Sequence, residues 1–396
     1  MNRQDCIFVL SFRKRRKYHK IAFAETLNPI SVINSAVSIS KEEKAMNSKE
    51  RVTNALAGKK IDRLPMWYGA EPALTEKIRL HLGLENEEQV YQALGADFRT
   101  IRPRYVGPEL EKNADGTFRT VWGILRGGGF WGTALDHPLS HVEEIEELED
   151  YTWPNPDDFD VTFTPEDIAI SKEYAIISGE WAPFYHEAEE LLGTEKFLMK
   201  LIEDPELAEA LLDKCLDFHM EINERLFSKY AQYIDVYWFA NDVGVSRGLL
   251  FGPELWRKYF KPRQKKLADQ GHKYGLKVAY HSCGDISSIM EDLIEIGIDI
   301  INPIQVSCPG MDPVELKKKY GGRINFFGAI DYNQLLSHGT VEEVKQGVKD
   351  MIDILGYDRQ MIVAPSHDLL MAEVPAENMV ALYETAKEYS PKYCAE

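Results

Sequence analysis

Short apolar runs alternate with longer amphipathic stretches along this chain from residue 63 onward. The runs are rich in β-branched and aromatic residues and are bounded by turn-forming residues, which is typical of buried strands. The stretches between them have helical periodicity, with start signals such as Pro253 and Thr340 and stop signals such as Gly297 and Gly356. We predict strands over residues 63–70, 97–103, 174–180, 235–241, 276–283, 299–305, 324–330 and 361–366.

Eight strands joined by helical crossovers predict an α/β fold, a TIM-type (β/α)8 barrel. A doubly wound open sheet is the alternative, but no G-x-G-x-x-G follows any predicted strand. Residues 104–160 interrupt the alternation with a Gly-rich aromatic segment and a Pro-rich acidic one. We predict that they form an insertion, a β-hairpin over the barrel mouth.

A single domain is predicted over residues 46–396. Met46 opens N-S-K-E-R-V-T-N-A-L, a capped amphipathic helix start, whereas residues 1–45 show no periodicity that continues into the body. We therefore expect residues 1–45 to be an N-terminal extension that is disordered or not part of the domain. Its basic stretch, residues 13–20, could alternatively be a targeting or nucleic-acid-binding tail.

Composition narrows the classes of function. The net charge is −18, and residues 1–45 hold nine Lys or Arg against four Asp or Glu, so the other 37 basic and 60 acidic residues give −23. Such an acidic body disfavours nucleic acid and anionic membranes as partners. Five dispersed cysteines and the lack of an apolar run of about 18 residues predict a soluble cytoplasmic protein with reduced thiols.

Polar residues close several of the predicted strands, where the active site of a barrel lies. We predict Glu180 and Asp242 as acid/base residues. The H-x-C spacing of His281 and Cys283 puts both side chains on one strand face, so an imidazole and a thiolate can bind one metal ion, with His367 as third ligand. We predict that the substrate is contacted by Trp67, Tyr68, Asn241, Gln305 and Asp331. Helix capping is the alternative role for such strand-end residues, Asp331 in particular.

Several motifs resemble the uroporphyrinogen decarboxylase superfamily, which includes the haem-pathway decarboxylase and zinc- and corrinoid-linked methyltransferases. They are K-I-D-R-L-P-M-W (60–67), P-E-L-W-R-K-Y-F-K-P (253–262), Y-H-S-C-G-D-I (280–286), F-F-G-A-I-D (326–331) and A-P-S-H-D-L (364–369). The true decarboxylase has arginines after its first-strand Trp that bind propionates, whereas this chain reads W-Y-G-A-E-P. The resemblance is therefore greater to the methyltransferase branch.

That resemblance implies zinc held by His281 and Cys283. The third ligand of that branch, usually a Cys, falls at His367, which is also the residue that the decarboxylase has there. Binding of substrate is therefore the alternative role for His367. We predict a methyltransferase that moves a methyl group between a small methylated substrate, such as a methoxylated compound or methylamine, and a corrinoid. The corrinoid would be carried by a partner protein, because the chain has no D-x-H-x-x-G motif. The alternatives are uroporphyrinogen decarboxylation and a non-catalytic barrel that binds a small ligand.

Overall fold

The computed structural model describes residues 46–128, 132–179, 182 and 184–394. Its central feature is a parallel sheet in the order β1-β7-β8-β11-β12-β13-β14. All seven strands fall within predicted ones: β1 (Phe98–Thr100), β7 (Ala175–Ser178), β8 (Val236–Ala240), β11 (Lys277–His281), β12 (Ile300–Ile304), β13 (Asn325–Ile330) and β14 (Met361–Pro365).

The two edges of this sheet are joined by the remaining predicted strand. The amide of Trp67 donates to the Val363 carbonyl in β14 at 3.0 Å, and the amide of Asp97, just before β1, donates to the Met66 carbonyl at 2.8 Å. Residues 63–70 form two isolated parallel bridges, Met66 with Val363 and Ala70 with Leu370, and no continuous strand. The pairing is shorter than predicted because Pro65 has no amide proton to continue it. The sheet nevertheless curls into a ring with eight strand positions.

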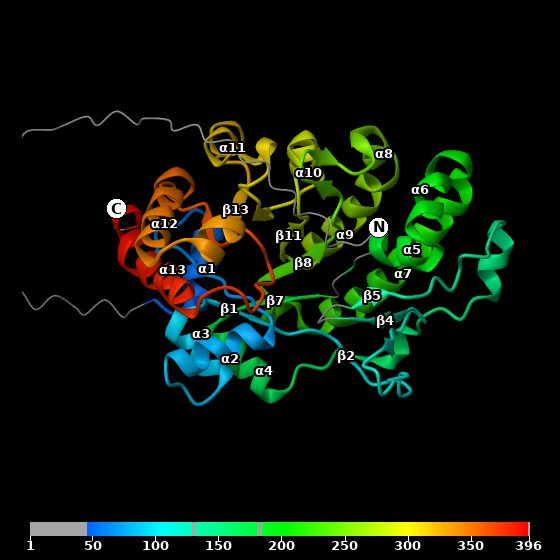
Figure 1. Cartoon of the computed structure of the whole chain (residues 1–396), viewed down its shortest axis with the longest axis horizontal. Coiled ribbons are helices and arrows are strands. Elements are labelled where there is room, and N and C mark those ends of the chain that lie inside the picture. The colour runs from blue at the N-terminus through cyan, green and yellow to red at the C-terminus, as the bar shows by residue number, and fades with distance from the viewer. Residues whose placement is uncertain (1–45, 129–131, 180–181, 183, 395–396) are drawn as a thin grey trace, which may run out of the picture. The chain divides into compact units, whose positions relative to one another are not determined.

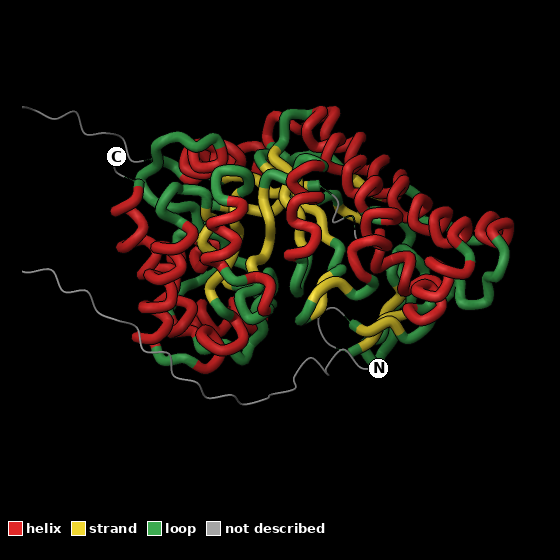
Figure 2. The backbone as a smooth tube through the Cα atoms, turned by 90° about the horizontal axis from the view of Figure 1, so that it is seen from above, coloured by secondary structure: helices red, strands yellow, loops and turns green. Residues whose placement is uncertain are grey.

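The two faces of the strands bury separate apolar clusters. In β8, Val236, Trp238 and Ala240 belong to an inner cluster, whereas Tyr237 and Phe239 belong to the outer one. This alternation follows from the two-residue period of a strand, which sends successive side chains to opposite faces. The inner cluster therefore fills the ring, and the outer cluster lies between the strands and the surrounding helices. Figures 1 and 2 show the strands at the centre with helices around them.

The helices begin where the sequence signals predict. Asn47 and Thr340 form capping boxes that start α1 and α12, and Pro253 lies in the first turn of α8. None of the helices in the described part of the chain has the length and apolar character needed to cross a bilayer. The α-helices are α1 (Ser48–Leu56), α2 (Pro72–His81), α3 (Glu87–Leu94), α4 (Pro165–Glu173), α5 (Phe184–Leu192), α6 (Thr194–Glu203), α7 (Pro205–Tyr230), α8 (Gly252–Tyr259), α9 (Lys261–Lys273), α10 (Met290–Glu295), α11 (Pro313–Tyr320), α12 (Val341–Leu355) and α13 (Ala376–Tyr389).

The predicted insertion contains more antiparallel structure than one hairpin. Strands β3 (Phe118–Arg119), β4 (Leu125–Gly127) and β5 (Thr133–Ala134) form a small sheet, and β2 (Arg104–Tyr105) pairs with β6 (Phe159–Asp160). This segment packs against two helices, since Trp122 contacts the Phe218 ring of α7 and Arg126 pairs with Glu190 of α5. Another hairpin, β9 (Gly244–Val245) and β10 (Gly248–Leu249), follows β8.

Candidate metal centre

Four chemically reactive side chains lie at or just beyond the carboxyl ends of three strands. Asp242 follows β8, His281 ends β11, Cys283 comes two residues later, and His367 comes two residues after β14. The sheet brings β8 and β11 together directly, and the curl of the ring brings the end of β14 toward them. Residues separated by 84 positions in the chain, Cys283 and His367, are therefore in contact.

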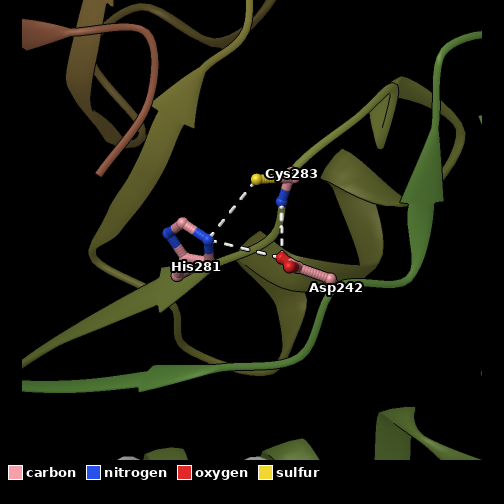
Figure 3. Close-up of side chains that lie close together, drawn as sticks. All are labelled: Asp242, His281 and Cys283. Atoms are coloured by element: carbon pink, nitrogen blue, oxygen red, sulfur yellow. Dashed lines mark hydrogen bonds and ion pairs between the residues drawn. The ribbon is translucent and has the colours of Figure 1, made fainter. Parts of the chain in front are cut away.

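The ligand atoms of these side chains converge on one small volume. The Sγ atom of Cys283 lies 3.7 Å from Nε2 of His281 and 3.9 Å from Nε2 of His367. The Oδ1 atom of Asp242 lies 3.3 Å from the same His281 nitrogen. Within the described residues, Asp242, His281 and Cys283 form a set whose ligand atoms all lie within 4.8 Å of one another (Figure 3).

These separations fit a zinc ion. In tetrahedral zinc sites the Zn–S bond is about 2.3 Å and the Zn–N and Zn–O bonds are about 2.05 to 2.1 Å. These bond lengths place a nitrogen ligand about 3.6 Å from a sulfur ligand and about 3.4 Å from an oxygen ligand. The observed N···S separations of 3.7 and 3.9 Å and the N···O separation of 3.3 Å are close to these values. The donor set of thiol, imidazole and carboxylate is also one that zinc prefers.

His281 is oriented by two neighbours from other strands. Its Nδ1 atom lies 2.6 Å from Oδ1 of Asn302 in β12, so Nδ1–H donates to this amide oxygen and Nε2 faces Cys283 and Asp242. The Trp238 ring of β8 packs edge-on against the imidazole, with centroids 5.3 Å apart. A fixed ring with its second nitrogen hydrogen-bonded to an amide or carboxylate oxygen is typical of a histidine that binds metal.

Asp242 is held in place through its backbone and side chain. Its Oδ1 accepts from the Cys283 amide at 2.8 Å, and its own amide donates to Nε2 of His186 at 3.0 Å. Burial raises the pKa of the Asp242 carboxyl, but interactions with His281, His186 and the Cys283 amide outweigh it and lower that pKa well below its usual range. The group is therefore a carboxylate at neutral pH.

The pKa values of the two histidines are shifted upward, in the opposite direction to that of Asp242. Burial lowers the pKa of His281, but Asp368, Asp242 and Cys283 outweigh this effect and raise it well above the usual range. For His367 the same balance, in which Cys283 and Asp368 oppose burial, raises the pKa to about 9. Asp368 contributes to both because its Oδ1 lies 3.9 Å from Nε2 of His281 and 3.4 Å from Nδ1 of His367. Without metal, the pocket therefore binds protons where a cation would bind.

The first-strand residues predicted to contact substrate face opposite directions. Trp67 packs against the inner cluster, with its ring 5.4 Å from that of Phe327. Tyr68 is 3% exposed in the outer cluster, where its hydroxyl pairs with Thr75 at 2.9 Å. Only Trp67 is thus placed on the side of the pocket.

The other predicted residues have mixed positions. Asn241 is fully buried, and its Oδ1 accepts from the Tyr185 amide at 3.1 Å. Gln305 supports the metal-site loop, because its Oε1 accepts from the Gly284 amide at 2.5 Å. Asp331 caps the turn of π-helix Tyr332–Leu336 by accepting from two amides, which agrees with the capping alternative. Glu180 lies outside the described residues.

Our predicted site omits Asp368 and Asn302, whose side-chain oxygens lie close to the histidines of the centre. Asp368 adjoins His367 in sequence, so its position at the end of the last strand was a signal that favoured including it. Asn302 lies in the middle of an apolar run, and its contact with His281 depends on the register between β11 and β12, which aligns these two residues. No local pattern indicates that contact.

Comparisons with known proteins bear on the family and on the fold. Residues 132–389 match the family model for uroporphyrinogen decarboxylase (URO-D). Two relatives named methylcobamide:CoM methyltransferase MtbA match over 65% of this chain and 71% of their own length, one from Methanosarcina acetivorans at 25% identity and one from Methanosarcina mazei at 22%. A solved structure of a methyltransferase from Methanosarcina mazei aligns with a TM-score of 0.61 at 19% identity, over 87% of this chain and 99% of that one.

Proposed function

This chain belongs to the uroporphyrinogen decarboxylase family, and we propose that it is a methyltransferase that moves a methyl group between a small methylated substrate and a corrinoid carried by a partner protein. The relatives named as methylcobamide:CoM methyltransferases support this proposal. The observation that carries it is the convergence of the Cys283 thiol with the Nε2 atoms of His281 and His367, at 3.7 and 3.9 Å.

In this proposal a zinc ion would be held by His281, Cys283 and His367, with the carboxylate of Asp242 beside the fourth position, which catalytic zinc keeps for its substrate. Bound zinc supplies Lewis-acid chemistry, which activates the heteroatom that bears the methyl group or the thiol that accepts it. The carboxylate of Asp242 would balance part of the positive charge, because its lowered pKa leaves it ionised at neutral pH and makes it a weak proton acceptor. Glu180 remains an acid/base candidate, on sequence grounds alone.

The rest of the chain has supporting roles. We propose one domain over residues 46–396, with the insertion over the barrel mouth and residues 1–45 outside the domain. Trp67 supplies an apolar wall for the substrate, and Asn241 and Gln305 shape the loops around it. Tyr68 has no part in substrate binding because its side chain is buried in the outer cluster. We also propose a cytoplasmic location.

Decarboxylation of uroporphyrinogen is the second candidate, favoured by the family description. A substrate with eight carboxylates needs several cationic partners. The segment from Trp67 to Pro72 contains no arginine or lysine, and Asp242 and Asp368 add negative charge at the pocket. The geometry therefore favours a smaller substrate. A barrel that binds a small ligand without turnover is the third candidate.

A direct assay separates these candidates. The zinc-loaded full-length protein would be incubated with cob(I)alamin and methoxylated or methylated-amine donors, and in the reverse direction with methylcobalamin and thiols, while absorbance reports the cobalt state. A uroporphyrinogen assay would run in parallel. We expect methyl transfer that is lost in His281→Ala and kept in His272→Ala, a control at an exposed ion pair with Asp299. Decarboxylation without methyl transfer would establish the second candidate, and ligand binding without either reaction the third.

A further inference from the structure

An arginine lies near the same centre, at the carboxyl ends of the barrel strands. Arg102 follows β1, and the pairing of this strand with β7 continues through Ile101, whose amide donates to the Ile177 carbonyl at 3.1 Å. Phe98 belongs to the inner cluster, so the two-residue period places Arg102 on the inward side of the chain, at the carboxyl end of the strand. Its side chain is exposed at this end.

A second observation gives the same position. The guanidinium carbon of Arg102 lies 5.6 Å from the centre of the Trp238 ring, a cation–π contact. That same ring packs against His281, with centroids 5.3 Å apart. The two distances limit the separation of the guanidinium from the imidazole to about 11 Å. A small ligand can therefore span from the proposed zinc to Arg102.

We propose that Arg102 selects a methyl donor that carries one anionic group, a carboxylate in particular; this inference rests on the proposed methyltransferase function. A guanidinium presents planar N–H donors that match a carboxylate in a bidentate pair. Arg102 has a further contact within the molecule, but its five donors allow it to hold a second acceptor as well. Trp67 supplies flat apolar surface for the body of the donor between its two ends.

The same contact disfavours a methylated ammonium donor. Such cations bind proteins through aromatic faces, and the Trp238 face already has the guanidinium of Arg102 over it. A second cation there would meet like-charge repulsion at close range. The arrangement therefore favours methoxylated acids over methylamines, which the sequence leaves as equal candidates.

The test compares matched ligand pairs that differ in charge. The probes are methoxyacetate with methoxyacetamide and 4-methoxybenzoate with 4-methoxybenzamide, and binding to the zinc-loaded full-length protein is measured by calorimetry. At least one carboxylate should bind about 10-fold or more tightly than its amide. In Arg102→Gln this preference should fall to within about 2-fold. Arg104→Gln is the control, because it makes the same charge change at an arginine that pairs with Asp160, and it should keep the preference.

The outcomes separate this inference from the function on which it rests. The inference is overturned if the unaltered protein binds neither acid more tightly than its amide, or if Arg102→Gln retains the preference. Trimethylamine serves as a cationic probe, and tighter binding of trimethylamine than of either acid would also overturn it. Methyl transfer from neutral or cationic donors alone would keep the proposed function and reject the anionic donor. A carboxylate preference that depends on Arg102, without methyl transfer to cob(I)alamin from any donor, would support the anion site and refute the methyltransferase.

Discussion

The hydrogen bond from His281 to Asn302 gives a quantitative test of how the centre is organised. Replacing Asn302 with Leu keeps a similar volume but removes the acceptor that lies 2.6 Å from Nδ1 of His281. Both residues are 2% exposed, so water has little access to replace it. The imidazole would then lose the contact that fixes its orientation and supports its Nε2 atom as a ligand.

The size of the effect follows from the burial and the charge of this contact. A buried hydrogen bond to a charged or metal-polarised group contributes about 1.5 to 3 kcal/mol, which corresponds to about 10-fold to 100-fold in zinc affinity. The same range is typical when the outer partner of a metal-bound histidine is removed. Asn302→Asp keeps a hydrogen-bond acceptor for Nδ1 of His281. Its zinc affinity should therefore stay within about 3-fold of that of the unaltered protein.

Competition with a chromophoric chelator measures both variants on the full-length chain, and thermal unfolding shows that each variant is folded. Zinc should bind weakly to Asn302→Leu and with normal affinity to Asn302→Asp. Equal zinc affinity in Asn302→Leu and the unaltered protein would refute the role of this hydrogen bond. Equal weakening in both variants would show that the site responds to any change of volume or charge, and would refute it as well.

Three other predictions test separate parts of the structure. Asp97 is fully buried and accepts hydrogen bonds from two arginines and the Met66 amide. Asp97→Ala should therefore lower the free energy of unfolding, measured by urea titration, by about 3 to 5 kcal/mol. A decrease of less than about 1 kcal/mol would contradict this prediction. Because the pKa of His367 is about 9 without metal, zinc must displace its proton, and the apparent zinc affinity should rise with pH from about 6.5 to 9; an affinity independent of pH in chelator competition would count against it. Trp67→Ala should raise KM for the methyl donor several-fold while Tyr68→Phe leaves KM within about 2-fold, and equal effects in steady-state kinetics would remove Trp67 from the pocket.

The strands could be predicted because their signal is local. Runs such as residues 235–241 and 299–305 are apolar on both faces, as expected when one face fills the ring and the other packs under helices. Helix starts at Asn47 and Thr340 are likewise encoded within a few residues. The first strand was predicted too long. The run around Pro65 has the apolar composition of a strand, but Pro65 lacks the backbone N–H that the pairing requires.

The site could be predicted only in part. His281 and Cys283 share a strand face through their spacing, so their proximity follows from sequence alone. The same two-residue rule argues against pairing Trp67 with Tyr68, because neighbours on a strand point to opposite faces. By contrast, the contact of Asn302 with His281 requires the register of two strands, and no pattern within either strand supplies it.

Metal analysis combined with X-ray absorption tests the central claim most directly. The full-length protein, purified with zinc in the medium, should hold about one equivalent of zinc whose spectrum fits one sulfur at about 2.3 Å and nitrogen or oxygen neighbours near 2.0 to 2.1 Å. Cys283→Ala should lose the sulfur neighbour and most of the metal, while Cys394→Ala, at the buried carboxyl-terminal cysteine, should keep both. A protein that binds no zinc, or zinc without a sulfur ligand, would contradict the metal centre and the methyl transfer proposed from it.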